Sequence, residues 1–409
     1  MTLNKSPNVK KNTLALAIKA ALLTTALGST VIAPTAMADS FTDALTDGKA
    51  SVDINVRYES VEQTGAETAS ALTERTRIGY KTGSLNGLKA FVEMTGTESI
   101  TDRSDYKVPG GPDANAGSSK AVIADPVVTR LNQAYLDYSI SKSNIKVGKQ
   151  RIVMDNRFLG NVGWRQTEQV YSGLRATIKE SDKVKLDYAY IVESDNIVGV
   201  KTPMETHALK ADIAAIPGVK LTAYGYMVDI TDSTADSQTY GIRLAGKPKL
   251  SDTVTGIYQA EFATQGDHAE SSGVSADYYH LKAGVKVDGV TLILAQESLG
   301  GDGTYAFQTP LATKHAFNGW ADKFLATPAN GLVDTYAKAA TKVSGIKIAA
   351  LYHDYKADKG GETYGSEFNI VVAKKFAKKY IVGAKYAAYT AKTHATDTTK
   401  LWVWGGVKF

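Results

Sequence analysis

The sequence contains no cysteine and no long uninterrupted hydrophobic run. Of its 409 residues, 43% are hydrophobic and none is cysteine, which excludes disulfide bonds and thiolate metal sites. A helical membrane protein needs apolar stretches of about 20 residues without charges, and none occurs here. The sequence therefore gives no support for a helical bundle in a membrane.

Signatures of catalysis and metal binding are also missing. The six histidines are scattered, without H-E-x-x-H or close ligand spacing, and neither a G-x-S-x-G elbow nor a P-loop occurs. We therefore expect no catalytic residue, no metal and no cofactor. An outer-membrane lipid hydrolase stays as an alternative, although the segment from His315 to Gly319 has no serine beside Asn318.

The chain has little excess charge outside its first 38 residues. It carries 47 Lys and Arg against 42 Asp and Glu, but four of the lysines and none of the acids lie in residues 1–38. The remainder therefore has 43 basic and 42 acidic residues. Such a balance does not favour a nucleic acid as partner.

The first 38 residues have the organisation of an export signal. Lys5, Lys10 and Lys11 precede an apolar stretch from Leu14 to Ala33, and Ala36-Met37-Ala38 supplies the small residues that signal peptidase recognises. We predict a secretory signal peptide over residues 1–38, cleaved after Ala38, followed by one domain over residues 39–409. An uncleaved membrane anchor is the alternative, which Lys19 within the apolar stretch disfavours.

Apolar residues alternate with polar residues through most of the remaining chain. Ala50, Val52, Ile54, Val56 and Tyr58 alternate with polar residues, which on a β-strand places the apolar side chains on one face. Strands of this kind are about 18 in number, an even count with lengths near the ~10 residues that cross a bilayer. Beyond the first strand they are predicted near 72–82, 88–97, 130–140, 144–151, 170–178, 184–193, 206–214, 219–228, 238–246, 254–263, 277–287, 290–298, 332–342, 345–354, 364–374, 380–390 and 399–409.

Short and long connections alternate between these strands. Asn86-Gly87, Pro217-Gly218, Asp288-Gly289 and Ser344-Gly345 suit tight hairpin turns, whereas the other connections are longer, notably 98–128, 152–169 and 299–331. A soluble β-sandwich has no reason to sort its loops in this way. We predict an all-β fold, a transmembrane up-and-down antiparallel β-barrel of about 18 strands with short periplasmic turns and longer extracellular loops.

The last strand ends on an aromatic residue. Leu401, Val403, Gly405 and Val407 share the parity of the terminal Phe409. This pattern resembles the C-terminal signature that the outer-membrane barrel assembly machinery recognises. We therefore expect that machinery, outer-membrane lipid and lipopolysaccharide as partners, and the bacterial outer membrane as location.

Several motifs resemble the alginate-export family of outer-membrane barrels. They are Gly148-Lys149-Gln150-Arg151, Asp155-Asn156-Arg157, Gly163-Trp164-Arg165-Gln166-Thr167 and Tyr171-Ser172-Gly173-Leu174-Arg175, with supporting similarity at 132–136 and 310–324. The resemblance implies an 18-stranded monomeric barrel. It departs from the alginate exporter itself, which is longer and carries a periplasmic plug loop, so it supports channel architecture more than alginate as solute.

Basic residues on the polar parity are the candidates for lining a lumen. Nine of the ten arginines precede residue 180, which places them on one arc of the wall or on its loops. We predict pore-lining, solute-selecting roles for Arg57, Arg75, Arg77, Arg175, Arg243 and Lys282. Two hypotheses remain open: the arginines form a strip that passes anions such as uronates, or they pair with lumen acids and brace the wall.

The connection 152–169 is the predicted constriction. Its Phe158, Leu159 and Trp164 are apolar residues that fit a loop folded against the inner wall. We predict that Asp155, Arg157, Trp164 and Arg165 line the narrowest point. Packing of Trp164 on the wall is favoured over stacking on a sugar ring.

The predicted function is that of a porin, an outer-membrane channel for small hydrophilic solutes that include anions or carbohydrate acids. The alternatives are a dedicated alginate or polysaccharide exporter and a non-conducting receptor or adhesin. About 18 strands enclose a lumen wider than side chains alone fill, so conductance separates these alternatives. A monomer is favoured over a trimer, and the sequence leaves the solute, the direction of transport and gating by loops open.

Overall fold

The computed structural model describes residues 34–114, 118–179 and 181–409, in two units that are treated separately. The first contains one helix, α2 (Pro34–Thr46). Most of the predicted signal peptide lies outside the described residues, and its cleavage point after Ala38 falls within α2. No helix of the described residues has the length and apolar character needed to cross a bilayer.

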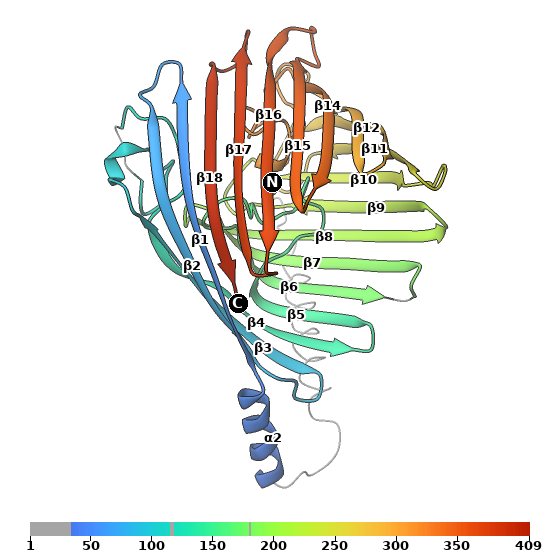
Figure 1. Ribbon diagram of the computed structural model, residues 1–409. Helices are drawn as coiled ribbons and strands as arrows, with labels where there is room; N and C mark the ends of the chain where they lie inside the picture. The colour runs from blue at the N-terminus through green and yellow to red at the C-terminus, as the bar shows by residue number, and fades with distance from the viewer. Residues whose placement is uncertain (1–33, 115–117, 180) are drawn as a thin grey trace, which may run out of the picture. The chain divides into compact units, whose positions relative to one another are not determined.

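The second unit, residues 48–409, is built from 18 antiparallel strands (Figure 1). Each strand pairs with its neighbour in sequence, and β18 pairs with β1, so the sheet closes without an edge and every strand has two partners. The strands are β1 (Lys49–Gln63), β2 (Ala69–Lys81), β3 (Leu88–Ser99), β4 (Val128–Ile140), β5 (Ser143–Gln150), β6 (Val170–Lys179), β7 (Val184–Asp195), β8 (Lys201–Ile216), β9 (Val219–Val228), β10 (Ser237–Gly246), β11 (Val254–Gly266), β12 (Ser275–Val287), β13 (Val290–Leu299), β14 (Leu332–Val343), β15 (Ile346–Lys356), β16 (Thr363–Phe376), β17 (Tyr380–Ala391) and β18 (Thr398–Lys408).

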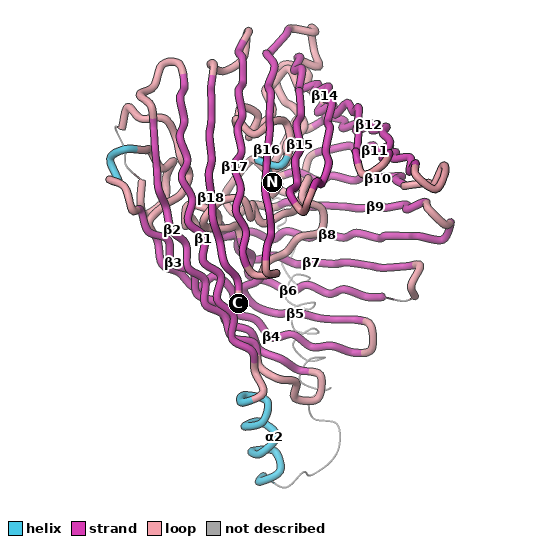
Figure 2. Tube along the Cα trace, viewed as in Figure 1, coloured by secondary structure: helices cyan, strands magenta, loops and turns pink. Residues whose placement is uncertain are grey.

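The predicted all-β barrel and its strand count are confirmed. Several strands are longer than predicted at one end: β1 continues to Gln63 and β8 begins at Lys201. These extensions have fewer outward apolar residues. The sequence pattern detects only apolar alternation, whereas strand pairing needs only backbone hydrogen bonds, so the extensions were not predicted. Figure 2 shows that strands account for most of this unit.

The two rims of the barrel differ in their connections. The short-turn rim includes two-residue turns such as Asp288-Gly289 and Ser344-Gly345, where both residues have positive φ as a tight hairpin requires. The long-loop rim carries three extended connections, which we name L2 (100–127), L3 (151–169) and L7 (300–331). The strict alternation predicted from the sequence is too strong, because 82–87 and 247–253 on the short-turn rim are as long as some connections opposite.

The two faces of the sheet have opposite character. Outward residues such as Ile78 and Leu294 are 59% and 63% exposed, whereas Arg77 on the inner face is 8% exposed. On β18, Leu401 and Val403 are exposed and Trp402 between them is buried, as the predicted parity requires. The cylinder therefore presents an apolar belt outside and a polar wall inside, the reverse of a soluble protein.

Candidate functional site

L3 folds against the inner wall of the barrel. The ring of Phe158 packs between Tyr224 of β9 and Tyr278 of β12, with centroid distances of 5.0 and 5.6 Å, and also contacts Phe307 of L7 at 6.2 Å. Leu159 beside it is 1% exposed. Burying an aromatic and an aliphatic side chain contributes about 1.5–3 kcal/mol each relative to exposure, so the apolar part of L3 holds the loop in the lumen as predicted.

Trp164 lies at the centre of an aromatic and cationic cluster. Its ring stacks on His315 of L7 at 5.3 Å, with 6° between the planes, and meets Trp402 and Trp404 of β18 edge to face. The Lys385 ammonium lies 4.2 Å from the same ring centroid. These contacts favour the wall-packing prediction, because a sugar ring would have to displace protein groups to stack there.

A buried polar network continues from this cluster. Lys385 of β17 donates to His315 Nε2 at 2.6 Å, and His315 Nδ1 donates to Asp322 at 2.6 Å. Burial lowers the pKa of His315 to about 3, so the imidazole is neutral and both contacts are consistent with the Nδ1–H tautomer. Asp322 also pairs with Lys400 at 2.8 Å, and L7 is thereby fixed to β17 and β18.

Arg165 joins three structural elements. Its guanidinium lies 2.8 Å from Glu59 of β1, 3.9 Å from Asp125 of L2 and 3.3 Å from Asp322 of L7. Burial alone would lower the pKa of Arg165, but the three carboxylates raise it. The side chain therefore remains charged and connects all three long loops to the wall.

Glu168, near the end of L3, collects a second set of partners. Arg77 lies at 3.6 Å and Arg151 at 2.5 Å, and Asn132 donates at 2.6 Å. Burial would raise the pKa of the Glu168 carboxyl, but the two guanidinium groups and the hydrogen bonds outweigh it and lower the pKa to about 2.

Asp155 and Arg157 fix the first half of L3. Asp155 pairs with Arg243 of β10, and Arg157 pairs with Glu297 of β13 at 2.8 Å while donating to Asn318 of L7 at 3.1 Å. The four predicted constriction residues, Asp155, Arg157, Trp164 and Arg165, therefore all lie inside the barrel against its wall.

The predicted pore-lining residues all lie on the inner face, and their arginines have carboxylate partners. Arg57 pairs with Asp125, Arg75 with Asp53, and Arg175 with Asp187 at 3.2 Å. The amine of Lys282 donates to Gln259 at 3.4 Å instead. Sequence reasoning missed the acids of the loops, Asp125, Glu168 and Asp322, because nothing in their local sequence distinguishes them from solvated loop charges.

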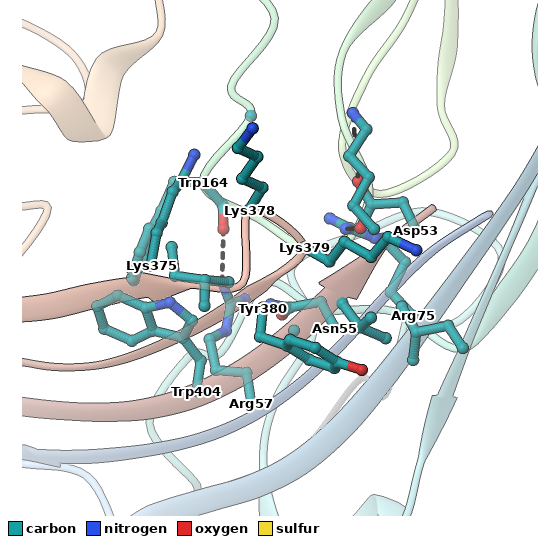
Figure 3. A pocket seen from close by; sticks show the side chains of 16 residues that line it. Asp53, Asn55, Arg57, Arg75, Trp164, Lys375, Lys378, Lys379, Tyr380 and Trp404 are labelled. Carbon is teal, nitrogen blue, oxygen red and sulfur yellow. Dashed lines mark hydrogen bonds and ion pairs between the residues drawn. The ribbon is translucent and has the colours of Figure 1, made fainter. Parts of the chain in front are cut away.

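Two cavities lie along the arginine-bearing wall. The larger, of about 310 Å³, is lined by Arg57, Arg75, Trp164 and residues of the β16–β17 turn (Figure 3). The smaller, of about 160 Å³, is lined by Arg77, Glu93, Arg151 and Glu168. Both are lined by Asp53, Gly163 and Lys408, so the two cavities adjoin one another.

Comparison with solved structures identifies similar barrels. OccAB2 of Acinetobacter baumannii has a TM-score of 0.73 at 16% identity, covering 90% of this chain and 99% of that one. OpdK of Pseudomonas aeruginosa, solved with vanillate, has a TM-score of 0.70 at 11% identity with 89% and 99% covered, and OccK3 of the same organism has 0.69 at 11% with 91% and 98% covered. These neighbours are outer-membrane porins, and the likeness shows a shared fold. No family model and no curated protein matches the sequence.

The resemblance to the alginate-export family is therefore wrong. The structural neighbours belong to the Occ and Opd porins, and the motif glycines have a purely architectural explanation. Gly148 and Gly173 face each other across β5 and β6 with φ of 125° and 157°. A Cβ at either position would lie within 2.3 Å of a neighbouring carbonyl oxygen. The glycines of the motif are thus required by close backbone packing at the strand ends that flank L3. Such packing is a property of the barrel and does not identify one family.

Proposed function

We propose that this chain is a bacterial outer-membrane channel that lets small hydrophilic solutes, anions among them, diffuse through its lumen. One observation carries the proposal: a closed cylinder of 18 strands has exposed apolar residues outside and buried charged residues inside. In hydrocarbon all backbone groups of such a sheet are paired, whereas in water the outer belt would be left exposed. The fold shared with OccAB2 and OpdK supports the same reading.

The orientation follows from the rims. The short-turn rim faces the periplasm and the long-loop rim faces the cell exterior, the arrangement usual for such barrels. The predicted signal peptide over residues 1–38 supplies export, and Phe409 at the end of the chain is the proposed contact with the barrel assembly machinery. Its ring is 57% exposed and lies beside the Lys379 ammonium at 4.8 Å. A monomer in outer-membrane lipid and lipopolysaccharide is the proposed resting state.

The paired arginines act as braces in this proposal. Arg57, Arg165 and Arg157 are each about nine-tenths or more buried beside carboxylates. A buried pair is held mainly because breaking it leaves an uncompensated charge. Of the two hypotheses for the arginines, bracing is supported by these contacts, and L3 and L7 become a fixed constriction.

Planar-bilayer recording of the purified mature chain tests the channel. Reconstitution should give discrete single-channel currents, and liposomes should swell faster in small sugars than in oligosaccharides that exceed the constriction. Reversal potentials under a salt gradient then report selectivity, in the native chain and in Arg75→Ala with Arg77→Ala. Absence of both current and swelling would exclude the channel and favour a receptor or adhesin, while hydrolysis of lipid or ester substrates would indicate an enzyme.

A further inference from the structure

The lining of the 310 Å³ cavity is unusually basic. Six of its lining residues are lysine or arginine and one, Asp53, is an acid. Its lysines are Lys375 at the end of β16, Lys378 and Lys379 in the following turn, and Lys408 at the end of β18. Figure 3 shows Lys375, Lys378 and Lys379 with the two arginines around this cavity, beside Trp404. The cavity thus opens near the short-turn rim, beneath L3.

The basic groups of this cavity differ in how they are compensated. Arg57 and Arg75 have Asp125 and Asp53 as partners. Among the described residues, the amines of Lys375, Lys378 and Lys379 have no carboxylate within 4.0 Å, and Lys408 approaches Asp53 only at 4.0 Å. The lysines therefore carry the surplus positive charge, whereas the arginines of the same wall are already paired.

The arginines at the base of the cavity also retain unused donors. The Nε atoms of Arg57 and Arg75 are buried and have no hydrogen-bond partner in the part of the chain that the structure describes. Orphaned buried donors are uncommon in folded proteins. Both donors belong to residues that line the cavity.

The turn that carries two of the lysines has an unusual backbone. Ala377 and Lys378 have φ of 48° and 59°, a region that costs a residue with a side chain roughly 1–2 kcal/mol. Other turns on this rim place glycine at the second such position, as at Gly289 and Gly345. A lysine is therefore kept where glycine would fit with less strain, which points to a use for its charge.

We propose that this cavity is a binding site for a small, doubly charged anion on the periplasmic side of the constriction. The assignment deepens the proposed channel function and rests on it. Several unpaired ammonium groups around a partly enclosed volume attract a dianion more strongly than a monoanion, because the interaction grows with the charge of the ligand. Phosphate monoesters and dicarboxylates share this chemistry, and the two are separated by experiment.

Equilibrium dialysis with labelled inorganic phosphate, in detergent and at low salt, is the first test. The native chain should bind phosphate at one saturable site, and Lys375→Gln with Lys378→Gln should weaken binding at least tenfold. Asp53→Asn, which removes the cavity's one acid, should tighten it severalfold. Succinate as competitor distinguishes the dicarboxylate class, and chloride at equal ionic strength should compete poorly.

A matched control removes the same charge from the same rim. Lys374→Gln with Lys142→Gln alters two lysines that do not line the cavity; Lys374 is exposed on the outward parity of β16, and Lys142 forms an exposed pair with Asp182. This variant should bind phosphate within twofold of the native chain. Equal loss in the control, or no saturable binding of either phosphate or succinate, would overturn the site.

Bilayer recording separates this site from the channel itself. Phosphate added on the short-turn side should reduce the current more strongly than on the other side, and the difference should vanish in the Lys375→Gln, Lys378→Gln variant. If the chain conducts but shows neither this asymmetry nor phosphate binding, the proposed site is wrong and the proposed channel function is unaffected. If the chain binds phosphate through these lysines but never conducts, the site is supported and the proposed channel function is wrong.

Discussion

Trp164 of L3 and His315 of L7 stack with ring centroids 5.3 Å apart and planes 6° apart, although they lie on different loops. Lys385 of β17 contacts both, through the Trp164 ring at 4.2 Å and His315 Nε2 at 2.6 Å. L3, L7 and the wall are therefore joined at one point. We infer that L3 and L7 behave as one rigid constriction and not as two independent flaps.

Replacing Trp164 should widen this constriction. Trp164→Ala removes the stack on His315 and the contacts with Trp402 and Trp404, so single-channel conductance should rise and current noise should increase as L3 loosens. The loss of packing should cost about 2–4 kcal/mol of unfolding free energy. Phe368→Ala, on the outward face, should leave conductance unchanged. A Trp164 variant with native conductance would contradict the rigid constriction.

Removing the guanidinium of Arg165 should destabilise the protein more than removing the carboxylate of Glu59. Arg165→Met leaves Glu59, Asp125 and Asp322 buried with one cation fewer, which should cost about 3–5 kcal/mol. Glu59→Gln should cost less, because Asp125 and Asp322 still compensate Arg165. Urea unfolding of the detergent-solubilised variants measures both. Equal stability of Arg165→Met and the native chain would show that the network contributes nothing.

The attachment of L3 should depend on pH only under acidic conditions. The pKa of Glu168 is lowered from its ordinary 4.5 to about 2 by Arg77 and Arg151, against the effect of burial. A carboxyl whose pKa is lowered on folding stabilises the folded state above its unfolded pKa, and this contribution is lost as the pH falls from about 4.5 towards 2. The contribution of Glu168 to stability should therefore be constant from pH 7 to 5 and be lost below.

Glu168→Gln is the control for this pH dependence. The variant cannot titrate at position 168, so the part of the acid transition due to this residue should disappear, and L3 should be less firmly held at neutral pH. His315 adds a separate effect on stability: burial lowers its pKa to about 3, so the folded state keeps the imidazole neutral while the unfolded chain takes up a proton, and stability falls as the pH drops below about 6.5. An acid transition below pH 5 that is unchanged in Glu168→Gln would contradict the assignment of Glu168.

Glycine at position 173 should be required for folding. Gly173 has φ of 157°, and an added Cβ would lie 2.0 Å from the carbonyl oxygen of Tyr190, so Gly173→Ala must shift β6 or β7. Gly65 has φ of 85° with nothing within 4 Å, so Gly65→Ala meets only the backbone cost of about 1 kcal/mol. The fraction of chain that migrates as a folded barrel in unheated SDS gels should fall sharply for the first variant alone.

The sequence predicts the barrel wall far better than the site inside it. The alternation along β1 and β18 determines which residues face outward, since period two allows only one assignment once the apolar face is known. The alternation does not predict which charged residues pair in the lumen, because Arg57 pairs with Asp125 and Arg77 with Glu168 only once the loops have folded inward. The motifs around Gly148 and Gly173 were assigned to the wrong family because they encode geometry that different barrels need.

The pairing of β18 with β1 makes the end of the chain decisive for biogenesis. Until Thr398–Lys408 have been synthesised and delivered, both β1 and β17 present unpaired backbone groups, which invite association with other chains. A chain that lacks β18 would thus keep two unpaired strand edges and be prone to aggregate, instead of forming a slightly smaller barrel.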